Sequence, residues 1–221
     1  MLGLHLVNIT WMGHACFALS GASKTVIFDP FKGIGIPEPA TKADIVLCSH
    51  SHSDHNNAAK VKHESSIVME GFTGRRMING ITISGVAVFH DDAQGGKRGR
   101  NSIYVVEMEN LRFCHLGDLG HALSLPQAAE IGSVDVLFVP VGGFYTIGPD
   151  EARRTRDALK PAVTIPMHYK MAGMASTFDA LHSIEDFLQK ETNVSRLDGP
   201  AFSVMKVGLP KEPTTIVPKL L

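Results

Sequence analysis

The order of the secondary-structure elements that the sequence predicts indicates an α/β fold built from two sheets. Short apolar or alternating runs, which are typical of strands, dominate the first half of the chain. In the second half such runs alternate with helical patterns. Two sheets covered by helices on their outer faces would satisfy this order. Because the 221 residues show no linker and no clear repeat, we expect residues 1–221 to form one domain.

The strands predicted in the first half are separated by glycine, serine, proline and asparagine turns. These strands span residues 4–10, 15–19, 24–29, 44–48, 66–69, 81–84, 86–90, 102–107 and 111–115. The run 44–48 is short and continuously apolar, as expected of a strand that is buried on both faces. A helical pattern at 56–62 follows it, and the Gly- and Pro-rich stretch 33–39 is predicted to be a loop.

Helix-start signals organise the second half. Ser124 can cap a helix that runs to about residue 131, with Pro126 in its first turn. A helix at 149–159 carries acids in its first turn and basic residues later, as the helix dipole favours. An amphipathic helix is predicted at 178–190. Strands are predicted at 135–140, 162–166 and 201–207.

Composition indicates a soluble globular protein, with 44% apolar and 19% charged residues. The net charge of −1 gives no electrostatic reason to expect a nucleic acid or an anionic membrane as partner. The three cysteines, Cys16, Cys48 and Cys114, lie in apolar, strand-like stretches and match no zinc-finger or disulfide spacing. We therefore expect reduced core cysteines and a cytoplasmic location.

Histidine is the unusual residue, with eleven in the chain, and three of them fall in the run His50-x-His52-x-Asp54-His55. The run follows the buried strand 44–48, at the kind of strand-to-helix turn where α/β folds place their chemistry. Side chains at positions i and i+2 of such a turn can aim at one point, and those at i+4 and i+5 at a second point beside it. Imidazole and carboxylate are ligands for zinc, iron or manganese.

Four side chains are too few for two metal ions, so further ligands must come from other strand ends. His90, Asp118 and His168 each come at or just after the end of an apolar strand. Any one of them alone would more often be a hydrogen-bonded turn residue. Together with the histidine run they form the set that a metal site predicts.

The ordered set resembles the metallo-β-lactamase superfamily over nearly the whole chain, and most closely the small metal-dependent hydrolases related to ascorbate-6-phosphate lactonases. The stretches that support this resemblance are Trp11-Met-Gly-His-Ala-Cys-Phe, Ile27-Phe-Asp-Pro, His115-Leu-Gly-Asp-Leu-Gly-His, Pro140-Val-Gly-Gly-Phe-Tyr and Ile165-Pro-Met-His-Tyr.

The resemblance implies a four-layer αββα sandwich and two divalent metal ions, with zinc the first expectation and manganese or iron the alternatives. It assigns the ligands as follows: His50, His52 and His90 to one metal, Asp54, His55 and His168 to the other, and Asp118 to both. Asp29 would hold the histidine-rich turn by hydrogen bonds, and His115 would lie behind the ligands.

For such a centre we expect a metal-bridging hydroxide to cleave an ester, lactone or phosphodiester bond in a small substrate. Asp54 would orient the hydroxide and move its proton. His14, Arg100 and Tyr145 are the candidates for contacts with the substrate, and the loops 31–41 and 91–101 are the candidates for the pocket walls.

Three alternatives stay open. A nuclease of the same superfamily would usually add a further domain or a basic arm, and an oxygen-reducing iron protein would usually carry Glu where this chain has His52. A non-catalytic metal-binding protein would more often use cysteine. Assembly into a homo-oligomer is a further option.

Overall fold

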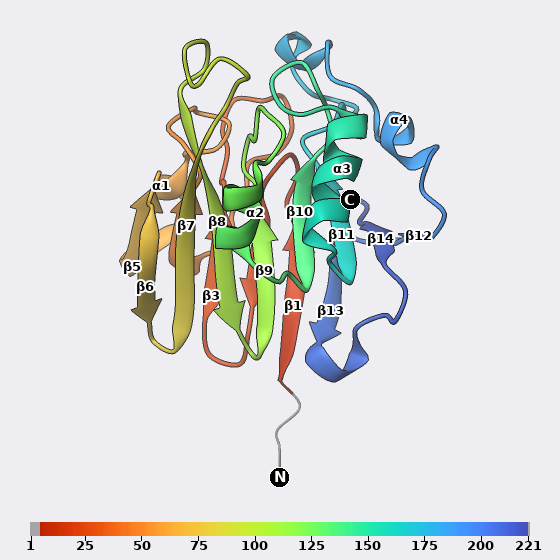
Figure 1. Cartoon of the computed structure of the whole chain (residues 1–221). Coiled ribbons are helices and arrows are strands. Elements are labelled where there is room, and N and C mark those ends of the chain that lie inside the picture. Colours follow the sequence, from red (N-terminus) through yellow and green to blue (C-terminus); the bar gives the residue numbers. More distant parts are fainter. Residues whose placement is uncertain (1–4, 221) are drawn as a thin grey trace.

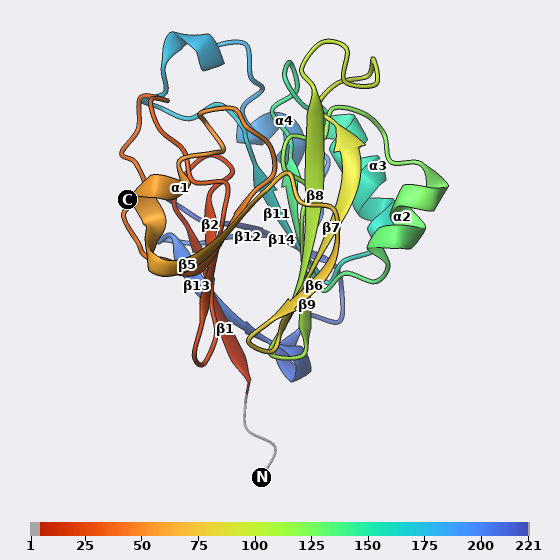
Figure 2. The same ribbon diagram turned by 90° about the vertical axis from the view of Figure 1, so that its left-hand side faces the viewer.

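Two β-sheets packed face to face make up most of the molecule (Figures 1 and 2). The computed structural model describes residues 5–220, so Leu4, which opens the first predicted strand, lies outside the described residues. Helix α1 (Ala58–Val61) lies on the outer side of the smaller sheet, and α2 (Leu125–Ile131) and α3 (Pro149–Leu159) cover the outer side of the larger one. The predicted αββα sandwich is thus confirmed, although its helices are few and short.

The smaller sheet has six strands. In spatial order they are β13 (Ala201–Met205), β1 (Leu6–Trp11), β2 (Phe17–Ser20), β3 (Thr25–Phe28), β4 (Ala43–Cys48) and β5 (Lys62–Glu70). Strands β1, β2 and β3 pair antiparallel, whereas β3, β4 and β5 pair parallel. Consequently β1, β3 and β4 all run in the same direction.

The larger sheet has eight strands. In spatial order they are β12 (Val194–Arg196), β14 (Thr214–Val217), β11 (Val163–Met167), β10 (Val136–Pro140), β9 (Leu111–His115), β8 (Arg100–Met108), β7 (Ile81–Phe89) and β6 (Gly74–Ile78). Strands β6 to β9 pair antiparallel, and β9, β10 and β11 pair parallel. Here β7, β9 and β11 share one direction.

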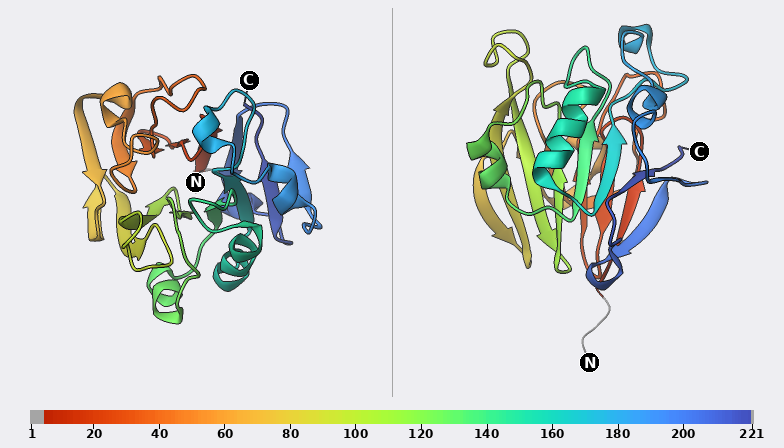
Figure 3. Two further views of the ribbon diagram at one scale, coloured as in Figure 1. Left: turned by 90° about the horizontal axis from the view of Figure 1, so that it is seen from above. Right: turned by 45° about the vertical axis from the view of Figure 1, so that its right-hand side comes forward.

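This pairing pattern brings the carboxyl-terminal ends of the strands that share this direction to one edge of the sandwich, the upper edge in Figure 1. The segments that follow β1, β3, β4, β7, β9 and β11 all begin there. The left view of Figure 3 looks onto this edge, where the connecting loops lie above the space between the sheets. Residues far apart in the sequence can therefore meet at this edge.

The core lies between the two sheets and joins them beneath this edge. Phe17 of β2 and Phe138 of β10 are fully buried, with ring centroids 4.5 Å apart. Tyr104 of β8 donates a hydrogen bond of 3.0 Å to the carbonyl of Cys48 at the end of β4. The Ser102 N–H of the same strand donates to the carbonyl of Ser49. These bonds fix the histidine-rich turn against the opposite sheet.

The prediction of a helix at 178–190 is wrong. A 3₁₀ turn at Ser176–Phe178 and helix α4 (Ile184–Leu188) replace it. Between them, the His182 N–H donates to the carbonyl of Gly142, and the His182 carbonyl accepts from Lys170 N–H. A continuous helix would need those backbone groups for itself. The apolar residues of this segment therefore pack from a backbone that is mostly irregular.

Other differences concern short or joined strands. The runs 81–84 and 86–90 form the single strand β7, and β6, β12 and β14 were not predicted. The helix after β4 is shorter than predicted, because β5 begins at Lys62. The Ser124 cap of α2 forms as predicted, with the Gln127 side chain completing a capping box. Within the described residues, no helix has both the length and the apolar composition needed to cross a membrane.

Candidate metal centre

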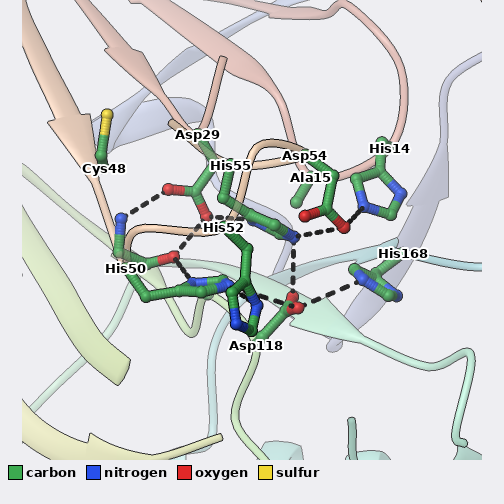
Figure 4. Close-up of polar contacts among 12 residues, drawn as sticks. His14, Ala15, Asp29, Cys48, His50, His52, Asp54, His55, Asp118 and His168 are labelled. Carbon is green, nitrogen blue, oxygen red and sulfur yellow. Dashed lines mark hydrogen bonds and ion pairs between the residues drawn. The ribbon is translucent and has the colours of Figure 1, made fainter. Parts of the chain in front are cut away.

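Asp118 lies at the centre of a cluster of histidines at the shared strand edge (Figure 4). Its Oδ1 is 3.2 Å from His55 Nε2, and its Oδ2 is 3.1 Å from His90 Nε2 and 3.3 Å from His168 Nε2. The His50 Nε2 is 3.8 Å from the same Oδ2. One carboxylate thus faces four imidazoles from three separate segments of the sequence.

The possible metal donors fall into groups whose ligand atoms lie within 4.8 Å of one another. The groups are His50, His52 and His90; His50, His55 and Asp118; and His14, Asp54, His55 and His168. The structure therefore brings together all seven residues that the resemblance implied as ligands. It adds His14, for which the sequence suggested only a contact with the substrate.

Asp29 holds this cluster from behind. It follows β3, and its carboxylate accepts hydrogen bonds from the Ser49 backbone N–H and hydroxyl, each 2.7 Å, and from His55 Nδ1 at 2.9 Å. Since His55 donates through Nδ1, its Nε2 is left to face Asp118. This carboxylate–histidine arrangement is the usual support of a metal-binding imidazole.

The same carboxylate reaches His50 through Ser49. The single hydroxyl proton of Ser49 is given to Asp29, so the 2.9 Å contact between Ser49 Oγ and His50 Nδ1 requires the ring to donate. His50 therefore presents the lone pair of its Nε2 to the cluster, where His52 Nδ1 lies 3.1 Å away. Sequence reasoning missed Ser49, because a serine next to a histidine is too common a pair to indicate a role.

Asn101 and Gly117 position Asp118, and the sequence indicated neither. The Asn101 side chain accepts a hydrogen bond of 3.0 Å from the Asp118 N–H and donates to the carbonyl of Leu116. Gly117 has φ +53, and a Cβ there would lie 2.4 Å from Asn101 Oδ1 and 2.6 Å from Ser49 Cβ. Only glycine combines this backbone conformation with so close an approach.

Burial and repulsion between neighbouring rings lower the pKa of several imidazoles in the cluster. Burial, and then the neighbouring His55, lower the pKa of His50 to about 3. Burial, and then His168, lower the pKa of His14 to about 4. Burial would also lower the pKa of His55, but the carboxylates around it, Asp118 first, raise it well above its ordinary value. Neutral imidazoles beside ionised carboxylates are the protonation states that bind a cation.

Unpaired polar atoms show that a cation fits this cluster. His14 and His168 have no hydrogen-bond partner at either ring nitrogen, and Asp118 Oδ1 and His55 Nε2 also lack one; all of these atoms are buried. Buried polar groups without partners are costly, by about 1–3 kcal/mol each. Imidazole nitrogens and carboxylate oxygens converging in this way are the donor set of a zinc, manganese or iron site.

The cluster opens to solvent through a pocket of about 350 Å³. His52, Asp54, His90 and Asp118 form part of its lining. The other lining residues come from the histidine-rich run, from the two loops predicted as walls and from the segments around residues 145 and 177: Ser53, Lys32, Gly33, Ile34, Lys97, Arg98, Tyr145, Thr177 and Phe178. A larger hollow of about 710 Å³, lined by Trp11, Tyr169 and Leu220 among others, contains none of the clustered residues.

Asp91 organises the loop between β7 and β8. Asp91 follows His90 directly and is by residue type a possible competing ligand. Its carboxylate instead accepts four backbone N–H bonds, from Ala93, Gly95, Lys97 and Arg98. Although burial opposes the shift, these donors hold the pKa of Asp91 below its usual range. The loop is thereby fixed with Lys97 and Arg98 at the pocket.

The remaining predicted site residues lie in different places. Tyr145 lines the pocket and donates to the carbonyl of Thr177, and the Arg98 guanidinium lies 5.1 Å from its ring centre. Arg100, at the start of β8, is exposed and is not among the residues that line the pocket.

His115 lies in the core behind the cluster. It is stacked on Phe28 at 4.8 Å, and its Nε2 is 2.8 Å from the carbonyl of Ala15. The three cysteines are buried and free, as predicted.

Fold and site together define a class of protein: a two-sheet α/β sandwich with a histidine- and aspartate-rich metal site at the carboxyl ends of its strands. The profile of the β-lactamase superfamily domain matches residues 8–168. The chain belongs to the metallo-β-lactamase superfamily and, within it, to the UPF0173 metal-dependent hydrolases. The finer likeness to ascorbate-6-phosphate lactonases stays a prediction.

Relatives from archaea and a bacterial structure carry this assignment. A UPF0173 metal-dependent hydrolase of Thermoplasma acidophilum is 31% identical over 202 residues, covering 80% of this chain and 87% of the relative. One of Archaeoglobus fulgidus is 29% identical over 222 residues, covering 87% and 93%. The crystal structure of a proposed zinc-dependent hydrolase of the superfamily from Thermotoga maritima is 40% identical, with a TM-score of 0.82 and coverage of 97% and 100%.

Proposed function

We propose that this chain is a dinuclear metal-dependent hydrolase that cleaves an ester, lactone or phosphodiester bond in a small anionic substrate. The observation that carries the proposal is the pocket, whose lining includes four of the clustered residues and which opens to solvent. A structural metal site would be closed, whereas a catalytic one keeps a position for water or substrate. The names of the relatives support hydrolysis as the reaction class.

The cluster would hold two divalent ions, with zinc the first expectation, and His50, His52 and His90 would lie on one side of Asp118 and Asp54, His55 and His168 on the other. When bound, such ions supply a water of lowered pKa and positive charge beside the bond being cleaved. Such chemistry needs no side-chain nucleophile.

Asp54 is the candidate for proton transfer. Its side chain is 22% exposed and lines the pocket, and one carboxylate oxygen lies 3.7 Å from His55 Nε2. Burial raises the pKa of Asp54, but His55 and then His14 lower it below its usual range, so the carboxylate is ionised at neutral pH. It can therefore accept a proton from an attacking water at the pocket floor.

Among the described residues, two cationic side chains without a carboxylate partner favour an anionic substrate in the pocket. Lys32 and Arg98 both line it, and within the described part of the chain neither has a carboxylate within 4.0 Å. Ile34, Tyr145 and Phe178 supply apolar surface beside them. A pocket of about 350 Å³ suits a small molecule, whereas a nucleic acid would need an extended basic groove.

A panel of lactones, esters and phosphodiesters, each with and without an anionic group, tests this function on metal-loaded protein. We expect turnover of at least one anionic member, and we expect Asp54→Asn to abolish it while thermal unfolding is unchanged. Turnover by Asp54→Asn at the rate of the unmodified protein would contradict the role of Asp54. Failure of the loaded protein on every member would contradict hydrolysis itself.

A matched pair of variants tests the anion preference. Arg98→Gln should raise KM for the anionic substrate by about tenfold or more, the cost of one charged hydrogen bond. Arg100→Gln removes the same charge two residues away, outside the pocket, and should leave KM unchanged. A raised KM for Arg100→Gln together with an unchanged KM for Arg98→Gln would instead indicate that Arg100 contacts the substrate.

A further inference from the structure

His14 occupies a backbone position that aims its ring into the cluster. It lies in the turn between β1 and β2, with φ +53, and its side chain is fully buried. Its carbonyl accepts hydrogen bonds from Trp11 Nε1 at 3.1 Å and from the His168 N–H at 3.4 Å. A left-handed conformation at a residue other than glycine costs about 1 kcal/mol or more and persists only where the surroundings impose it.

The ring of His14 is surrounded by residues of the cluster. Its Nε2 lies 3.5 Å from Asp54 Oδ2, and its ring centroid lies 4.1 Å from that of His168 and 5.1 Å from that of His55 (Figure 4). Neither ring nitrogen has a hydrogen-bond partner. One ligand atom from each of His14, Asp54, His55 and His168 fits within 4.8 Å of all the others.

A purely structural histidine explains this less well. Phe31 and Phe178 contact the ring edge to face, which is what a core aromatic would do. A core histidine, however, normally satisfies its ring N–H, as His115 does with the carbonyl of Ala15. A shared cation would satisfy the unpaired nitrogens of these three imidazoles together with the carboxylate.

We propose that His14 is a direct ligand of the metal held by Asp54, His55 and His168. This inference rests on the metal centre of the proposed function. It implies that the two metal positions of that centre have different numbers of ligands. One position has His50, His52 and His90, whereas the other has four side chains, and Asp118 lies between them. The larger donor set should hold its metal more tightly and leave fewer places for water. The exchangeable position is then the one that includes His52, the exposed histidine of the pocket.

The variant His14→Asn tests this without disturbing the turn, because asparagine tolerates positive φ. A chelator titration followed by metal analysis should show two steps of metal loss for the unmodified protein. His14→Asn should lose its tighter step, with an affinity reduced at least about tenfold. With cobalt as probe, the variant should show one hyperfine-shifted imidazole N–H resonance fewer. A histidine that merely hydrogen-bonds Asp54 would leave that count unchanged.

His121→Asn is the matched control, because His121 lies outside all the donor groups and contacts Phe89 N–H and the carbonyl of Ala122. His14→Gly with added imidazole is a second variant, and recovery of the tight step would support direct ligation. Two unchanged steps and an unchanged resonance count in a folded His14→Asn protein would overturn the inference and leave the proposed function standing. Failure of the unmodified protein to bind metal would instead overturn the proposed function.

Discussion

Three residues of the site hold left-handed backbone conformations although none is glycine. They are His14 with φ +53, Asp29 with φ +42 and His168 with φ +55. Each such conformation costs about 1–3 kcal/mol, and such strain gathers where side chains must be aimed. Each of the three follows a strand that ends at the shared edge. The backbone strain therefore accompanies the convergence of side chains from both sheets on one point.

Replacing Asp29 tests how the cluster is supported. Its carboxylate accepts three hydrogen bonds, and Asn can accept through one oxygen only, so Asp29→Asn should leave Ser49 and His55 less well oriented. We expect metal affinity to fall by about 10–100-fold, as measured by competition with a chelator. Asp92→Asn is the control, because that exposed carboxylate pairs with Lys97 outside the cluster. Equal affinities for the two variants would contradict a supporting role for Asp29.

The site residues that could be predicted from the sequence are those whose types are unusual at the end of an apolar strand. His90, Asp118 and His168 each interrupt an apolar context, so a metal site was the economical explanation for the set. Ser49 and Asn101 escaped notice because their roles depend on which backbone groups approach them in the folded chain. For the same reason, the depth at which His14 is buried could not be predicted.

Among the elements, the loop between β7 and β8 links the fold to the pocket. The two carboxylate oxygens of Asp91 accept two backbone N–H bonds each, and Asp91→Asn replaces one of these oxygens by an NH2 group that cannot accept. We expect a raised KM with kcat less affected, and faster proteolysis within residues 92–99. Steady-state kinetics and limited proteolysis measure the two effects. A fall in kcat alone, with the loop still resistant, would indicate that Asp91 acts on the cluster instead.

The parallel pairing of β3 with β4 delivers Asp29 and the histidine-rich turn together, and Asp44 ties these strands. Its carboxylate accepts bonds from Lys24 Nζ at 2.7 Å and the Thr25 N–H at 2.9 Å. Burial opposes the shift, but these donors lower the pKa of Asp44. A lowered pKa in the folded state means that the bonds stabilise the protein above the unfolded pKa of about 3.9, and that this stability is lost as the pH falls through the folded pKa.

Asp44→Asn should therefore lower the free energy of unfolding at neutral pH by about 0.5–1 kcal/mol, since the pair is partly exposed. The difference from the unmodified protein should shrink as the pH falls below about 4. Urea unfolding of both proteins across this pH range measures it. A difference that persists undiminished in acid would show that shape, not charge, matters at this position.

Element prediction succeeded where a local pattern matched the packing. The helices at 125–131 and 149–159 carry their own start signals, and the buried strands are short apolar runs. The segment 178–190 has helical spacing, but its backbone pairs with Gly142 and Lys170 instead. The short strand β14 pairs with β11, and β12 pairs with β14, which no local pattern reveals.

For the molecule as a whole, strand direction explains the position of the site. Strands of both sheets end at one edge, and the Tyr104 bond to Cys48 and the Ser102 bond to Ser49 join the sheets just beneath it. The two-sheet architecture could be predicted because strands and helices follow one another in a recognisable order. The depth of the pocket could not, since it depends on how the loops pack over the cluster.

The central claim is that this edge holds two divalent metal ions on histidines and aspartates. The most direct test is metal analysis of purified protein after loading and desalting, beside a His50→Ala/Asp118→Asn double variant. We expect about two ions per chain for the unmodified protein and a loss of both in the variant. An unmodified protein that retains no metal, or a folded double variant that retains both ions, would contradict it.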